Sequence, residues 1–119
     1  VYTGTHDNDT TLGWYLSMSD AQREPLHKYL SAHQQDISAP INVLQALIDI
    51  ALASQACLAI IPMQDILHLD DNHRMNTPGT VENNWLWRFD WSQLSDGMEK
   101  DFAQAITKYG RNPSSKGLV

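Results

Sequence analysis

Apolar residues recur at helical spacing along much of the 119-residue chain. The clearest helix is expected to begin at Pro40, because proline is tolerated in the first turn of a helix. Ile41, Leu44 and Ile48 then follow at spacings of three and four, and neighbouring apolar residues widen the stripe. A stripe this wide predicts a helix that is buried on more than one side.

Two shorter helices are expected before it. The first covers residues 12–18 and follows a run of residues with short polar side chains, so that Asp7 or Asp9 is expected to cap it. The second begins with Ser19 and Gln22, which have the spacing of a capping box. A polar stretch over residues 32–39 then predicts a connection rather than a helix.

A last amphipathic pattern predicts a helix around residues 94–109, and Gly110 is expected to end it. Residues 113–117 are rich in proline, serine and glycine and predict a loose tail.

Two short runs have the character of β-strands. Val1–Gly4 is β-prone, and Cys57–Ile61 is a continuous apolar run that Pro62 ends. Continuous apolar runs are typical of parallel strands that are covered on both faces. The order of strand, helices and strand therefore predicts an α/β fold in which a crossover joins two parallel strands.

Composition excludes several classes of function. The net charge is −6 and the chain has eight basic residues, so neither nucleic acid nor an anionic membrane is an expected partner. The single cysteine, Cys57, lies in an apolar run and is predicted to be a buried, unreactive thiol. These features predict an acidic, cytoplasmic protein.

Polar side chains gather after both predicted strands. His6 and Asp7 follow the first, and Gln64 and Asp65 follow the second. Sites in parallel α/β proteins lie at the carboxyl ends of strands, so these groups are candidates for one site. For Asp7 two interpretations stay open, a carboxylate directed into the site and a helix cap.

No metal or other cofactor is predicted. His6 lacks companion residues at metal-ligand spacing, and no phosphate-binding glycine loop is present. His68 and His73 flank two aspartates, but such a mixture is more typical of a solvent-facing loop. A calcium loop is excluded because its glycine and distal glutamate are missing.

Trp85, Trp87 and Trp91 recur at a spacing close to that of a strand. Core packing is the commoner use of tryptophan, but flat aromatic faces also stack on sugar rings. The amide of Asn76 can donate to and accept from sugar hydroxyls, and it equally suits a turn before Pro78.

The segment Tyr2–Trp14 closely resembles a signature of the 4-α-glucanotransferases, also called amylomaltases or disproportionating enzymes. Three further segments resemble motifs of the same family in the same order, Pro62–Leu67, Arg74–Thr80 and Asn84–Arg88. The resemblance implies a (β/α)8 barrel. Residues 1–119 would form a single partial domain, comprising about the last two βα units and mostly helical.

The resemblance also implies a retaining glucan transfer between maltodextrins. Asp7 would stabilise the transition state, and His6 and Asn76 would bind the α-1,4-glucan substrate. Gln64 and Asp65 would either contact sugar or brace the loop. The nucleophile and the acid/base residue would lie on strands outside this chain, so the chain alone is expected to be inactive.

Two other classes of function compete with this interpretation. The tryptophans and asparagines fit a non-catalytic carbohydrate-binding module. Apolar strand edges without neighbours would instead favour a helical piece that self-associates.

Overall fold

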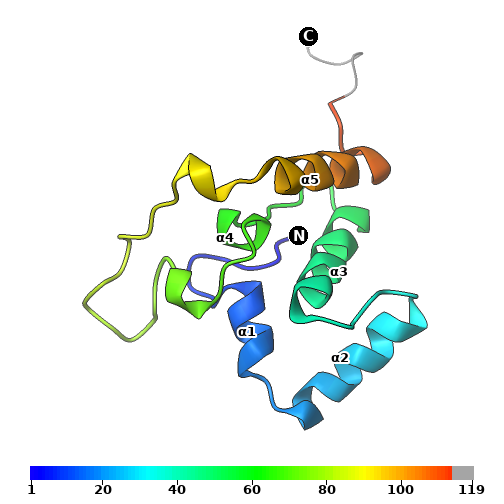
Figure 1. Cartoon of the computed structure of the whole chain (residues 1–119). Coiled ribbons are helices and arrows are strands. Elements are labelled where there is room, and N and C mark those ends of the chain that lie inside the picture. Colours follow the sequence, from blue (N-terminus) through cyan, green and yellow to red (C-terminus); the bar gives the residue numbers. More distant parts are fainter. Residues whose placement is uncertain (114–119) are drawn as a thin grey trace.

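The computed structural model describes residues 1–113, and helices dominate it (Figure 1). Of the predicted tail over residues 113–117, all but Pro113 lies outside the described residues. The predicted helices are confirmed close to their expected ranges. In chain order the elements are α1 (Thr11–Ser17), α2 (Asp20–Ala32), α3 (Pro40–Ala53), α4 (Met63–Ile66), the 3-10 turns η1 (Asp71–His73) and η2 (Trp91–Gln93), and α5 (Asp96–Lys108).

Helix α3 is the centre of the packing. Leu44, Ile48 and Leu52 pack with Leu12 of α1 and Ala105 of α5 in one buried cluster. A second buried cluster also includes α3 residues, and its members are Tyr15, Leu30, Val43 and Ala46. The prediction that this helix is buried on more than one side is confirmed.

The two strand-like runs meet in parallel but form a single bridge, between Tyr2 and Ile60. The backbone N–H of Ile60 donates to the Val1 carbonyl at 2.9 Å, and that of Thr3 donates to the Ile60 carbonyl at 3.4 Å. The parallel pairing is therefore as predicted. The extended strands themselves are absent from the described residues, because only one bridge joins the two runs.

The cap of α1 differs from the prediction. Thr10, not Asp7 or Asp9, is the N-cap, and its hydroxyl accepts from the Gly13 backbone N–H at 3.1 Å. Thr10 stands immediately before the first helical residue, which is where a capping oxygen reaches the free N–H groups. Both aspartate side chains are consequently available for other contacts.

The other predicted helix signals are confirmed. Ser19 and Gln22 form the capping box of α2. Pro40 is in the first turn of α3. Gly110 adopts a φ of +66° just after α5, a left-handed conformation that glycine adopts without steric cost.

One burial prediction is wrong, and core packing, the commoner of the two uses left open for the tryptophans, does not hold for two of them. Cys57 is exposed rather than buried, since the apolar run that contains it is covered on one side at most. Trp85 and Trp91 are also exposed, by 60% and 73%, and no strand connects them. Both belong to a segment, residues 74–95, that extends away from the helices in Figure 1.

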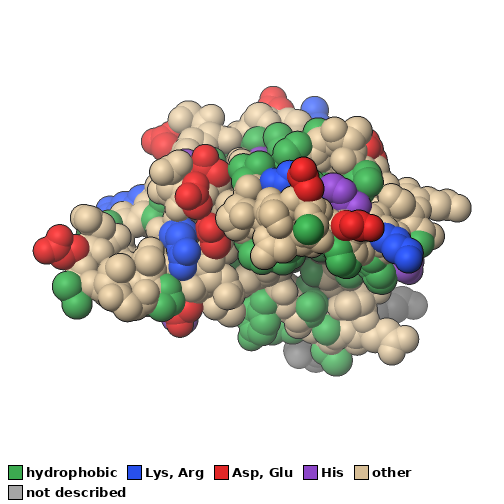
Figure 2. All heavy atoms as spheres, turned by 90° about the horizontal axis from the view of Figure 1, so that it is seen from below, with side chains coloured by type: hydrophobic (Ala, Val, Ile, Leu, Met, Phe, Trp, Pro, Cys, Tyr) green, Lys and Arg blue, Asp and Glu red, His purple; other side chains and the backbone are tan. Residues whose placement is uncertain are grey.

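Apolar side chains also reach the surface elsewhere. In Figure 2 hydrophobic side chains gather along the lower part of the view, whereas charged side chains lie mostly above them. The exposed apolar residues include Val1, Leu58 and Ile60 beside the bridge. Within residues 1–113, no helix combines the length and the apolar character needed to cross a bilayer.

Candidate functional site

The loop of residues 4–10, which joins the Tyr2 bridge to α1, carries the first predicted site residues. Its backbone turns at Thr5–Asn8, where the Asn8 N–H donates to the Thr5 carbonyl at 3.1 Å. The Asn8 side-chain oxygen accepts from the Thr5 N–H and hydroxyl at 2.8 and 3.0 Å. Asn8 thereby folds the loop, and the side chains of His6 and Asp7 stay about half exposed.

Asp7 and Asn76 meet although they are 69 residues apart in the chain. The Asn76 amide Nδ2 donates to Asp7 Oδ1 at 2.7 Å, and His6 Nε2 lies 3.3 Å from Asp7 Oδ2. The structure therefore brings together three of the predicted site residues. His6 and Asp7 are exposed and Asn76 is partly exposed, so a ligand can reach this cluster.

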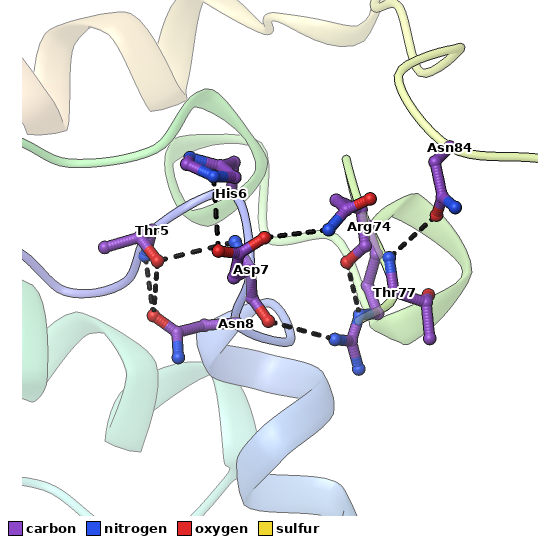
Figure 3. Close-up of polar contacts among 8 residues, drawn as sticks. Thr5, His6, Asp7, Asn8, Arg74, Thr77 and Asn84 are labelled. Atoms are coloured by element: carbon purple, nitrogen blue, oxygen red, sulfur yellow. Dashed lines mark hydrogen bonds and ion pairs between the residues drawn. The ribbon is translucent and has the colours of Figure 1, made fainter. Parts of the chain in front are cut away.

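Arg74 is a member of this site that the sequence reasoning did not single out. Its guanidinium donates through Nη2 to the Asp7 carbonyl at 3.2 Å and through Nε to the Asn76 carbonyl at 3.3 Å. One side chain thus holds the backbones of both segments, as Figure 3 shows. In the sequence, Arg74 begins the segment Arg74–Thr80, which resembles a family motif, and this position indicated that Arg74 could belong to the site.

Trp85 also lies at this site, and the sequence analysis had left its role open between core packing and stacking on a sugar ring. Its indole lies beside the His6 imidazole, with ring centroids 4.9 Å apart and planes tilted by 41°. The Trp85 backbone has a φ of +62°, which is rare for a bulky residue. Positive φ values of this kind cluster at functional sites, where the surroundings hold them.

The loop before Trp85 is closed by polar contacts. The Trp85 N–H donates to the Met75 carbonyl at 2.7 Å. The Asn84 side-chain oxygen accepts from the Thr77 N–H at 2.8 Å, and its amide nitrogen donates to the Thr80 carbonyl at 3.2 Å. Figure 3 shows Asn84 directed toward Thr77. These bonds fix residues 75–85 as one loop beside Asp7.

A cavity of about 500 Å³ lies between the two loops. His6, Gln64, Arg74 and Trp85 are among its lining residues. This volume is within the range of small-ligand sites in proteins. Polar groups at the edge of aromatic rings suit a polyhydroxylated ligand such as a sugar.

Gln64 and Asp65 differ in what they offer. Gln64 uses its amide Nε2 to donate to the His73 carbonyl at 3.2 Å and keeps its other polar atoms for the cavity. Asp65 is 1% exposed, and both its carboxylate oxygens accept hydrogen bonds from Thr3 and Thr11. For Asp65 the geometry favours the bracing alternative over contact with sugar.

Asp9 is an unusual carboxylate beside the site. Burial raises its pKa above the ordinary value, although the Thr10 N–H and the Arg74 charge act in the opposite direction. Its Oδ1 is buried and has no hydrogen-bond partner among the described residues. Asp9 therefore costs stability when ionised.

His68 and His73, the histidines that flank the two aspartates, make no metal site among the described residues. No group of three or more potential metal ligands occurs within residues 1–113. His73 lies 3.2 Å from Asp70 across the turn η1. His68 was predicted to face solvent, but it is partly buried, and this burial lowers its pKa.

Comparison with known proteins decides the family. A family described as 4-alpha-glucanotransferase matches residues 1–94, which include both site loops. The chain belongs to the 4-alpha-glucanotransferase family. A 4-alpha-glucanotransferase of Synechocystis is 41% identical over 111 residues, covering 93% of this chain and 21% of that protein. The chloroplastic/amyloplastic 4-alpha-glucanotransferase DPE1 of Arabidopsis thaliana is 44% identical over 115 residues, covering 93% and 19%.

The fold is also that of a family member. An amylomaltase from Streptococcus agalactiae, solved in complex with acarbose, superposes with a TM-score of 0.83 at 28% sequence identity. The match covers 94% of this chain and 22% of that one. The chain is thus a mostly helical part of an amylomaltase fold, and it spans about a fifth of the length of the relatives it matches.

Proposed function

We propose that this chain forms one side of the catalytic cleft of a 4-α-glucanotransferase that moves α-1,4-glucan segments between maltodextrins. The observation that carries the proposal is the 2.7 Å hydrogen bond that joins Asp7 and Asn76, whose chain neighbours His6, Asn8 and Met75 line the cavity. These residues come from two segments that resemble separate family motifs. The bound acarbose of the Streptococcus agalactiae amylomaltase, an α-glucan analogue, gives further support.

The reaction proposed is a retaining double displacement. A carboxylate nucleophile attacks the anomeric carbon, while a carboxylic acid protonates the departing glycosidic oxygen. The acid, now deprotonated, accepts the proton of an acceptor 4-hydroxyl, which attacks the glycosyl-enzyme and frees the nucleophile. Both groups belong to parts of the protein outside residues 1–119 in this proposal.

Asp7 takes the role of a third carboxylate in this mechanism. Placed close to the sugar ring, it would strengthen its interaction as positive charge develops toward the oxocarbenium-like transition state. Asn76 donates to Oδ1, and His6 Nε2 lies 3.3 Å from Oδ2, so Asp7 and His6 form one half-exposed pair that would meet the sugar hydroxyls together. Such groups act without reorganisation because they are fixed in advance.

The remaining cavity residues have binding roles in this proposal. The Trp85 face gives a platform for the apolar side of a sugar ring, and the free amide oxygen of Gln64 accepts from a hydroxyl. No metal or other cofactor takes part in the proposed steps. The glucan is the partner that we propose for this surface.

We further propose that the chain is the C-terminal part of a (β/α)8 barrel, about its last two βα units. The parallel bridge between Tyr2 and Ile60 supports neighbouring parallel strands. The loops that carry His6 and Gln64 follow these strands, as active-site loops of such barrels do. A cytoplasmic location stays a prediction.

The first test measures mass and glucan exchange on one preparation, with maltotriose as substrate and glucose release as the readout. We expect the 13.4 kDa chain to be inactive and the full-length protein that contains it to be active. Activity at 13.4 kDa, in a preparation free of full-length protein, would contradict the proposal that the nucleophile lies elsewhere.

The second test replaces Asp7 by Asn in the full-length protein. Turnover should fall by about 100-fold or more, because the charge opposite the transition state is lost. Asp49→Asn is the matched control, since Asp49 lies on α3 and accepts a hydrogen bond from Gln45 at 3.0 Å. Unchanged turnover in Asp7→Asn would remove Asp7 from the site.

A further inference from the structure

Asp65 joins three polar groups in the interior beside the site. Its Oδ2 accepts from the Thr3 hydroxyl at 2.6 Å and from the Thr11 hydroxyl at 2.7 Å. Its Oδ1 accepts from the Thr11 backbone N–H at 2.9 Å. Asp65 is 1% exposed, and its two bonds to Thr11 are buried, whereas the bond to Thr3 is partly buried.

The two threonines that Asp65 binds stand on either side of the loop of residues 4–10. Thr3 comes just before the loop of residues 4–10, and Thr11 comes just after it as the first residue of α1. The backbone N–H of Thr11 is in the first turn and has no partner within the helix. Asp65 therefore fastens both ends of the loop that carries Asp7.

We propose that Asp65 is a positioning residue that fixes Asp7 in its working geometry. The inference rests on the role of Asp7 proposed above. Hydrogen bonds to a carboxylate are short and about twice as strong as those between neutral groups, so this link restrains the loop ends firmly. Within the loop, the Thr5–Asn8 turn shapes the backbone but does not anchor it to the rest of the molecule.

The Asp65→Asn variant replaces one of the two hydrogen-bond acceptors of Asp65 by a donor. An amide oxygen still accepts from the Thr11 N–H, but an amide nitrogen now donates where Oδ2 accepted from two hydroxyls. Small displacements of catalytic groups cost up to about 100-fold in rate. We expect kcat for maltotriose exchange by the full-length protein to fall about 10- to 100-fold, with KM changed less than about threefold.

A double-mutant cycle tests whether Asp65 acts through Asp7. If it does, Asp65→Asn lowers kcat by less than about threefold when Asp7 is already Asn. If the two effects multiply in full, the positioning role is wrong, although the proposed function stands. If Asp7→Asn alone leaves kcat unchanged, the role of Asp7 and the positioning of it both fail.

Substitutions of Thr3 perturb the same hydrogen bonds less than Asp65→Asn does, so the protein is expected to fold. Thr3→Val removes the hydroxyl at nearly constant volume, and Thr3→Ser retains it. We expect Thr3→Val to lower kcat severalfold and Thr3→Ser to restore most of it, with Asp49→Asn unchanged as the control for a lost carboxylate. Equal kcat in Thr3→Val and Thr3→Ser would overturn the proposal.

Discussion

The helical core and the candidate site are held by different forces. Around α3, apolar side chains such as Leu44 and Ile48 are fully buried and need no polar partner. Around Asp7, the contacts are directional bonds between segments far apart in the chain, and most of the side chains are exposed. Stability should therefore depend on the first region and turnover on the second, with Gly13 and Asp65 at the junction.

The largest expected effect on stability is in the core. Leu44→Ala removes a side chain that is 1% exposed and leaves a cavity beside Leu12 and Ala105. The free energy of unfolding should fall by about 2–5 kcal/mol. Urea unfolding of the chain measures it, and Ile41→Ala, at a position of the same helix that is 46% exposed, is the control. Equal losses for the two variants would contradict the assigned core.

Gly13 tests the junction between the regions. A Cβ at this position would lie 2.7 Å from the Asp71 backbone nitrogen and 2.5 Å from Asp9 Oδ1, so α1 and η1 must separate. Gly13→Ala should cost about 1–3 kcal/mol of unfolding free energy. Gly97→Ala is the matched control, because the nearest atom is 3.8 Å away and alanine favours the helix by about 1 kcal/mol.

Asn84 tests the site without the core. Asn84→Ala removes the bonds to Thr77 and Thr80, which lie in an exposed loop, and should cost less than about 1.5 kcal/mol. The same change should raise KM for maltotriose in the full-length protein, because the loop loses its closure. Asn84→Asp keeps an acceptor for the Thr77 N–H, so its KM should lie between those of the unchanged protein and Asn84→Ala. A large loss of stability would show that this loop supports the fold.

The smallest expected effect is the pH dependence at Asp9. Its pKa is raised in the folded chain, so its contribution to stability is full below the ordinary value of 3.8 and is lost as the pH rises through the raised value. Asp9→Asn should remove this loss. Unfolding free energies of both proteins from about pH 4 to about pH 7 measure it, and parallel curves would contradict the assignment.

Local signals in the sequence predict the helices and much of the site. The capping box at Ser19 and the proline at position 40 each act through nearby residues, and both are confirmed. His6, Asp7 and Asn76 were found from two segments that resemble family motifs, and they do meet.

The missed features depend on contacts between distant segments. Asp7, Asp9 and Thr10 all have side chains that can cap a helix, and Thr10 is the cap because α1 begins at Thr11. The exposure of Cys57 depends on what covers its run, which the run itself does not encode. The roles of Arg74 and Asp65 follow from bonds that span more than 50 residues, and no spacing rule predicts such pairs.

The link from Asp65 to Thr3 has a consequence for the order of folding. Its two ends are 62 residues apart, and α1, α2 and α3 lie between them. Closing so long a segment is entropically costly until the helices have packed, so this link is expected to form after the transition state. Asp65→Asn should then accelerate unfolding of the chain and leave its refolding rate nearly unchanged in stopped-flow experiments. The loop that carries Asp7, the proposed transition-state residue, would be the last to assemble and the first to open.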